Sequence, residues 1–251
     1  MATARLLPRP LRLLSTLRTN PYPPRRTFIS IPDPTKPQIL TASRRLPYDH
    51  ERLYDIIADV DSYVRFLPYC KVSRVTRWTD PIPTPTPSSS PNSSSPGNPH
   101  TTTTARRWPT QADLTAGWGG FEETYTSRLF CVPTLGIVEA ISGDARTEIP
   151  ASSLRSHGLT DPGPDIGSRG VFKSLVTRWT VVPARDAVRQ ERFQHGWSDV
   201  RLTIKYQFAN PLYTAVSSAV ADKVAGVMVE AFVQQAQRVL KETRNDPGVV
   251  R

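Results

Sequence analysis

A stretch without proline runs through the C-terminal part of the chain, from Pro211 to Pro247. Asn210 is a typical helix N-cap, and Pro211 fits the first helical position because its missing N–H would have no intrahelical acceptor there. Apolar residues recur at helical spacing beyond it, so we expect a helix of about nine turns, roughly 50 Å long. Its first half is rich in alanine and serine, which either pack closely against a sheet or leave room for a ligand.

The first thirty residues are rich in arginine and contain no acidic residue. Leucines can form one apolar face of a helix there, opposite the arginines, which is typical of a mitochondrial presequence. We therefore expect residues 1–30 to be a targeting peptide and residues 31–37 a linker. The alternative is a basic tail without structure.

Most of the formal charge of +10 lies in this leader region. Residues 1–45 hold nine of the 32 basic and one of the 22 acidic residues, which leaves 23 basic against 21 acidic residues in the remainder. The body is almost neutral, so the charge gives no reason to expect nucleic acid as a partner.

Between the linker and the final helix, polar and apolar residues alternate as in half-buried strands. Residues 49–60 instead have apolar residues at helical spacing, and residues 61–67 form a second short helix that Pro68 ends. An antiparallel sheet needs cover on its apolar face, and the final helix is the large element that can supply it. The expected strands are residues 38–44, 71–78, 110–117, 121–132, 136–143, 172–182 and 198–208.

Two segments interrupt the strand pattern. Residues 80–107 are dominated by proline, serine and threonine, which cannot bury a core, so we expect a disordered loop. A linker between domains is the alternative. Residues 145–170 form an irregular insertion. We interpret both as decorations of one domain that spans residues 38–245.

The order of one strand, two short helices, six strands and a long helix resembles the helix-grip fold of START-like lipid-binding and polyketide-cyclase-like proteins. Several motifs are similar to those of one family, the mitochondrial coenzyme Q-binding START-domain proteins. These motifs are residues 53–63, 66–70, 112–121, 175–179 and 204–213.

This resemblance implies an α+β fold, in which a curved antiparallel sheet wraps round the C-terminal helix with a hydrophobic tunnel between them. It also implies a carrier or chaperone that binds ubiquinone and supports respiratory electron transport and quinone biosynthesis. Such a protein would lie peripherally on the matrix side of the mitochondrial inner membrane, near respiratory or quinone-biosynthesis complexes.

For the ligand site we predict apolar side chains from the sheet, the final helix and the tunnel mouth. Each of them could instead be ordinary core, and Trp118, which lies among glycines, could seat a ring or fill a β-bulge. The predicted ligand-binding residues are Phe66, Leu67, Leu114, Trp118, Phe121, Tyr125, Leu129, Val138, Val220, Val224, Met228 and Phe232.

The turn that ends at Pro68 is our candidate for membrane contact. Tyr63 and Phe66 would enter the lipid interface, while Arg65 and Lys71 would face anionic head groups. The alternative is a contact that joins the helix to the sheet.

The residues that could carry chemistry are few. Two cysteines do not make a metal cluster, and the sequence contains no catalytic motif, so we expect no enzyme activity, no catalytic residue, no metal and no catalytic cofactor. One alternative is a cyclase or dehydratase acting on a hydrophobic quinone precursor through Glu122 or Glu123. Another is a ribosome-associated interaction module, which would need a basic patch.

Overall fold

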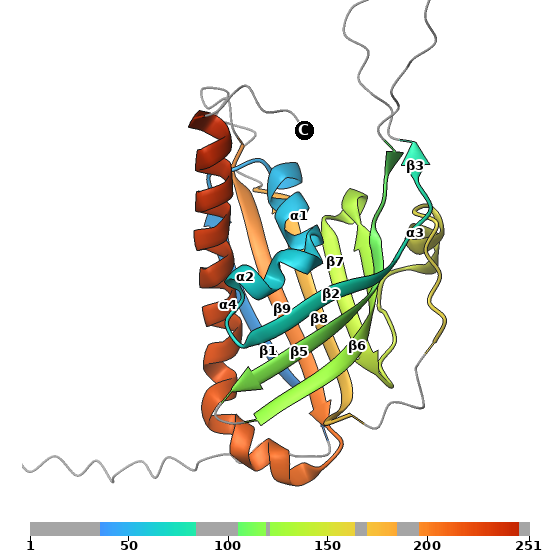
Figure 1. Ribbon diagram of the computed structural model, residues 1–251, viewed down its shortest axis with the longest axis vertical. Helices are drawn as coiled ribbons and strands as arrows, with labels where there is room; N and C mark the ends of the chain where they lie inside the picture. Colours follow the sequence, from blue (N-terminus) through green and yellow to red (C-terminus); the bar gives the residue numbers. More distant parts are fainter. Residues whose placement is uncertain (1–35, 84–104, 119–120, 164–169, 185–195, 246–251) are drawn as a thin grey trace, which may run out of the picture. The chain divides into compact units, whose positions relative to one another are not determined.

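The structure, a computed structural model, describes residues 36–83, 105–118, 121–163, 170–184 and 196–245. Its main element is a curved antiparallel sheet of seven strands in the order β1-β9-β8-β7-β6-β5-β2 (Figure 1). All seven expected strands are confirmed. Their bounds are β1 Gln38–Leu46, β2 Cys70–Trp78, β5 Pro109–Trp118, β6 Phe121–Val132, β7 Ile137–Gly143, β8 Phe172–Pro183 and β9 Ser198–Phe208.

Short helices connect the two edge strands of this sheet. Helix α1 (His50–Ala58) begins where the Asp49 carboxylate accepts hydrogen bonds from two backbone amides of the first turn. A 3₁₀ turn, η1 (Val60–Ser62), leads into the single-turn helix α2 (Tyr63–Phe66), which ends before Pro68. This segment carries the chain from β1 to β2, at the opposite edge of the sheet.

The long helix α4 (Pro211–Asn245) confirms the expected C-terminal element. It packs along β1 and β9 on the concave side of the sheet (Figure 1). No helix in the described part of the chain combines the length and hydropathy that a membrane span needs. The side chains of residues 214–222, which hold most of the small residues noted above, lie outside the described set.

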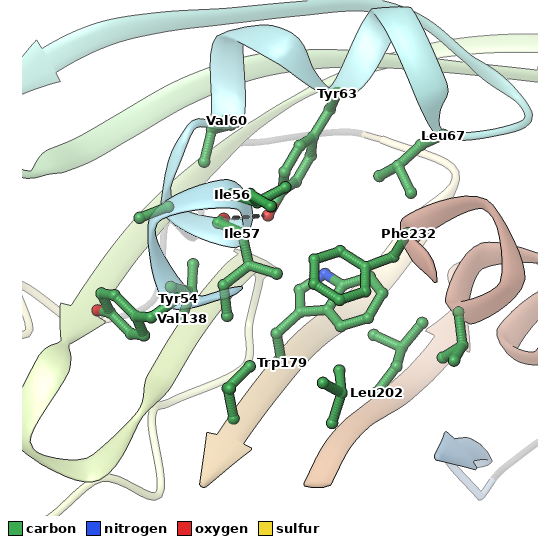
Figure 2. Close-up of a cluster of buried hydrophobic side chains, with 14 of the residues drawn as sticks. Tyr54, Ile56, Ile57, Val60, Tyr63, Leu67, Val138, Trp179, Leu202 and Phe232 are labelled. Carbon is green, nitrogen blue, oxygen red and sulfur yellow. Dashed lines mark hydrogen bonds between the residues drawn. The ribbon is translucent and has the colours of Figure 1, made fainter. Parts of the chain in front are cut away.

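Every second side chain of the strands points to the concave face, and these side chains form the main core. Leu202 of β9 and Trp179 of β8 point into it, and the Phe232 ring of α4 lies 5.3 Å from the Trp179 ring between centroids (Figure 2). Leu53 and Ile57 of α1 are fully buried in the same cluster. The two short helices and α4 therefore share one core with the sheet, as the helix-grip order predicts.

The opposite face of the sheet carries a second core, which part of the insertion 145–170 covers. This segment contains helix α3 (Ala151–Arg155), and its Leu154 and Leu159 pack on Phe130 and Ile141 of the sheet. It covers apolar surface that would otherwise meet water, so it belongs to the folded domain. Residues 164–169 lie outside the description.

Under the segment that covers this face, the sheet carries a buried carboxylate that bonds to both the sheet and the segment. Glu139 of β7 is fully buried and forms an ion pair with Arg178 of β8, whose Nε lies 2.5 Å from Glu139 Oε2. Thr147 of the covering segment donates to the other carboxylate oxygen. The segment is thus attached to the sheet by polar as well as apolar contacts.

The expected disordered loop falls mostly on residues 84–104, which lie outside the described residues. At its two ends, β3 (Ile82–Pro83) and β4 (Ala105–Arg106) pair as a short two-stranded sheet. The two ends of the long insertion are therefore held side by side.

Candidate ligand-binding cavity

The concave face of the sheet, the α1–α2 segment and α4 form a cavity of about 200 Å³. An apolar cavity of about 150 Å³ is known to hold benzene, so this one has room for a single ring with a short substituent. Most of its wall is aliphatic or aromatic. The sheet contributes, among others, Leu114, Tyr125, Leu129, Val138, Ala140, Leu175, Trp179, Ile204 and Tyr206, and the helical segments contribute Val60, Tyr63, Leu67, Val224 and Met228.

Seven of the twelve predicted ligand-binding residues line this cavity. They come together from β5, β6, β7, the end of α2 and the middle of α4, which are far apart in the sequence. They are Leu67, Leu114, Tyr125, Leu129, Val138, Val224 and Met228. The side chains of Trp118, Phe121 and Val220 lie outside the described set, so their placement stays a prediction.

Two predicted residues lie elsewhere. Phe232 is fully buried against Trp179 and supports the cavity wall from behind. Phe66 makes an edge-to-face contact with Tyr63, 5.7 Å between ring centroids, and lines a groove on the surface instead. Helical spacing placed Phe232 on the same face of α4 as Met228, but only the packing of the sheet decides which side chain meets open space.

The expected membrane contact of Tyr63 also needs correction. Its side chain is only 7% exposed, and its hydroxyl donates to the Ile57 carbonyl oxygen at 2.5 Å (Figure 2). Burial raises the pKa of this phenol well above its usual value, so it stays neutral. Tyr63 therefore belongs to the cavity wall and joins α2 to α1. Arg65 is exposed, and Lys71 pairs with Glu122 on the surface.

The wall also contains residues that the sequence did not single out. Trp179 of β8 and Ile204 and Tyr206 of β9 occupy every second position of their strands, on the face that points to the core. This alternation is the signal that could have found them. Tyr69 gave no such signal. It lines the cavity, is 40% exposed, and has a φ of 67°, a region that non-glycine residues rarely adopt. Because it touches both cavity and solvent, Tyr69 marks an opening.

The described wall of the cavity carries no charged side chain. None of its described lining residues is Asp, Glu, Lys, Arg or His. Burial raises the pKa of the Cys70 thiol, which lies in the wall, to about 11, so this group is neutral near pH 7. The indole N–H of Trp179 has no hydrogen-bond acceptor among the described residues.

The acidic residues considered for an enzyme mechanism lie outside the wall. Glu122 is on the surface with Lys71, and Glu123 accepts a hydrogen bond from the Val171 amide at 3.1 Å. In the described part of the chain, His, Cys, Asp and Glu side chains form no group of three or more that could hold a metal ion. The cavity suits an uncharged apolar molecule.

Comparison with known proteins places the chain in a family. The sequence model of the family described as "Polyketide cyclase / dehydrase and lipid transport" matches residues 46–233. The chain belongs to this family, and its fold is the START-like helix-grip fold.

Curated relatives are similar at modest identity over most of the chain. The mitochondrial coenzyme Q-binding protein coq10 of Schizosaccharomyces pombe is 28% identical over 78% of this chain and 85% of that protein. The mitochondrial coenzyme Q-binding protein COQ10 of Eremothecium gossypii is 26% identical over 89% and 84%. The ribosome association toxin RatA of Pseudomonas aeruginosa is 22% identical over 78% and 94%.

Among solved structures, the Zhui aromatase/cyclase of Streptomyces sp. R1128 aligns with a TM-score of 0.48 at 10% identity. The alignment covers 81% of this chain and 96% of that one.

Proposed function

We propose that this member of the polyketide cyclase/dehydrase and lipid transport family binds ubiquinone in the apolar cavity, and that it carries or presents the quinone without transforming it. The observation that carries the proposal is the uncharged, largely aliphatic and aromatic wall of a cavity with room for about one ring. A quinone ring with an isoprenoid tail has no charge to satisfy and gains free energy by leaving water for such a wall.

The relatives support the identity of the ligand. The two fungal proteins named above carry coenzyme Q binding in their names and span most of the chain. Trp118, Phe121 and Val220 remain proposed ligand contacts beside the seven residues that line the cavity.

A binding role fits the placement of the titratable groups. Proton transfer in a cyclase or dehydratase needs an acid or base within reach of the substrate, and neither Glu122 nor Glu123 lines the cavity. The enzyme alternative predicts turnover of a quinone precursor that is lost in a Glu123→Gln variant. The carrier proposal predicts unchanged ligand binding in the same variant.

The proposed setting is the matrix side of the mitochondrial inner membrane. Residues 1–30 would direct import, residues 31–37 would act as a linker, and residues 38–245 would form one lipid-binding domain. Arg65 is exposed at the end of α2, four residues before Tyr69, and can face anionic head groups there. Bound there, the protein would exchange quinone with the bilayer for respiratory electron transport and quinone biosynthesis, in contact with the complexes of either process.

A charge in the wall tests the proposal. In Met228→Glu, a carboxylate replaces an apolar cavity-lining side chain, and burying it beside the ligand without a partner is expensive. We expect ubiquinone binding, measured in detergent with the purified full chain, to fall by about a hundredfold or more. The control Leu135→Glu changes a side chain that is 38% exposed in a surface turn and should bind as the wild type does. Unchanged binding in folded Met228→Glu would contradict the proposal.

A further inference from the structure

A groove lies on the surface between α2 and α4, beside the cavity. It has a volume of about 350 Å³. Val64 and Val227 stand on its two sides and are exposed to 43% and 42%. Such paired exposure of apolar side chains across a groove leaves a strip of apolar surface in water. The remaining lining residues are Arg65, Phe66, Leu67, Pro68, Glu230, Ala231 and Gln234.

The groove and the cavity share a wall. Leu67 and Pro68 line both of them, so these two residues separate the interior space from the surface strip. Leu67 is 7% exposed, and its side chain points from the end of α2 toward the core (Figure 2). A shift of this pair would join the cavity and the groove into one continuous channel.

Few backbone hydrogen bonds hold the segment that contains this pair. Helix α2 has a single turn, and the Leu67 amide is held by one bond to the Tyr63 carbonyl, at 2.8 Å. The next backbone bond, from the Cys70 amide to the Leu67 carbonyl, is 3.4 Å long. Segments with few backbone hydrogen bonds open locally at a small fraction of the global unfolding free energy. Tyr69, with its φ of 67°, follows directly.

The volumes decide what occupies the groove. The cavity of about 200 Å³ holds a ring and a short substituent, which is far less than a quinone with a long isoprenoid tail. We infer that the α2–α4 groove binds the part of the isoprenoid tail that the cavity cannot hold, and that Leu67 and Pro68 form the gate between the two. This inference rests on the proposed quinone binding and assigns the groove to the same ligand.

The inference is tested by comparing quinones of different tail length in the wild type and in a variant of the groove. Val227→Glu places a charge in the groove without touching the cavity, because Val227 lines only the groove. Leu135→Glu is the matched control, since Leu135 is similarly exposed and lies in the η2 turn (Pro133–Leu135). The probes are a ubiquinone with a single isoprene unit and a ubiquinone with a long tail, each titrated into the full chain in detergent.

We expect the wild type and Leu135→Glu to bind the long-tailed quinone at least about tenfold more tightly than the short one, because more apolar carbon leaves water. In Val227→Glu this preference should vanish, with short-tail affinity unchanged. Equal affinity of Val227→Glu and wild type for the long tail would overturn the inference while leaving quinone binding intact. Failure of the wild type to bind either quinone would overturn the proposed function itself.

A second measurement separates the tail from a membrane as the occupant of the groove. Flotation of ligand-free protein with phosphatidylcholine–cardiolipin vesicles should be the same for wild type and Val227→Glu. If Val227→Glu loses vesicle binding but keeps its long-tail preference, the groove contacts the bilayer and the inference is wrong.

Discussion

We expect Ala140→Leu to make the ligand-free protein more stable and to weaken quinone binding. Ala140 lies on β7, lines the cavity and is opposite Leu129 and Thr177 on the neighbouring strands. Its methyl group leaves open space that a leucine side chain can enter. The same three carbons that improve packing would then occupy the position of the ligand.

The structure sets the size of the effect. At roughly 24 cal/mol per Å³, a closed and dry cavity of about 200 Å³ would cost the empty fold about 5 kcal/mol, and the opening at Tyr69 makes this an upper limit. Three added carbons recover at most about 2 kcal/mol at ~0.8 kcal/mol each, and imperfect fit reduces this to about 1 kcal/mol. For a domain of this length, that gain raises Tm by about 2–4 °C.

Thermal and urea unfolding of the ligand-free full chain measure the gain, and titration with ubiquinone measures the loss. Ala112→Leu is the control, because Ala112 is fully buried in the core but does not line the cavity. Overpacking there should destabilise by about 1–3 kcal/mol. If Ala140→Leu destabilises as much as Ala112→Leu, the space is not available to a side chain. If it binds ubiquinone as the wild type does, the ligand lies elsewhere.

In Arg178→Met, the free energy of unfolding measured in urea should fall by about 3 kcal/mol, because the buried Glu139 loses its ion-pair partner. The double variant with Glu139→Leu should recover most of this loss. An unchanged stability of Arg178→Met, or a double variant no more stable than Arg178→Met, would contradict this role of the ion pair. Burial raises the pKa of Cys70 to about 11, so its alkylation should speed up about tenfold per pH unit from pH 8 to 10 and slow when ubiquinone fills the cavity. Cys131, fully buried, should stay unreactive in the native protein, and equal labelling of both thiols would contradict this. Replacing residues 84–104 by a short glycine linker should leave ubiquinone binding unchanged, because β3 and β4 already hold the two ends together; loss of binding from a folded deletion would refute it.

The sequence predicted the strands and the long helix because each has a periodicity that local residues alone determine. Alternation and helical spacing also reveal which side chains face the concave side, and seven of those residues line the cavity. The same periodicity cannot separate wall from core. Met228 and Phe232 are one helical turn apart, yet the first lines open space and the second packs on Trp179.

Other features depend on contacts between distant segments. Alternation along its strand would place Glu139 on a solvent-exposed face. It is buried because Arg178 pairs with it and Thr147 of the segment 145–163 bonds to it. That segment has no clear periodicity, so its role as cover for a second core could not be predicted. Tyr69 adopts a left-handed conformation that the turn after α2 imposes, with its carbonyl accepting the Gly117 amide at 2.9 Å.

If the apolar cavity holds ubiquinone, the purified protein should contain it, and its bound molecules can be identified directly. The full chain and Val224→Lys, which places a charge in the cavity wall, should be extracted with organic solvent and examined by mass spectrometry, with Leu135→Lys as the surface control. We expect near-stoichiometric ubiquinone in the wild type and in Leu135→Lys, and none in folded Val224→Lys. An empty wild-type protein, mixed phospholipids, or the same ubiquinone content in all three proteins would contradict it.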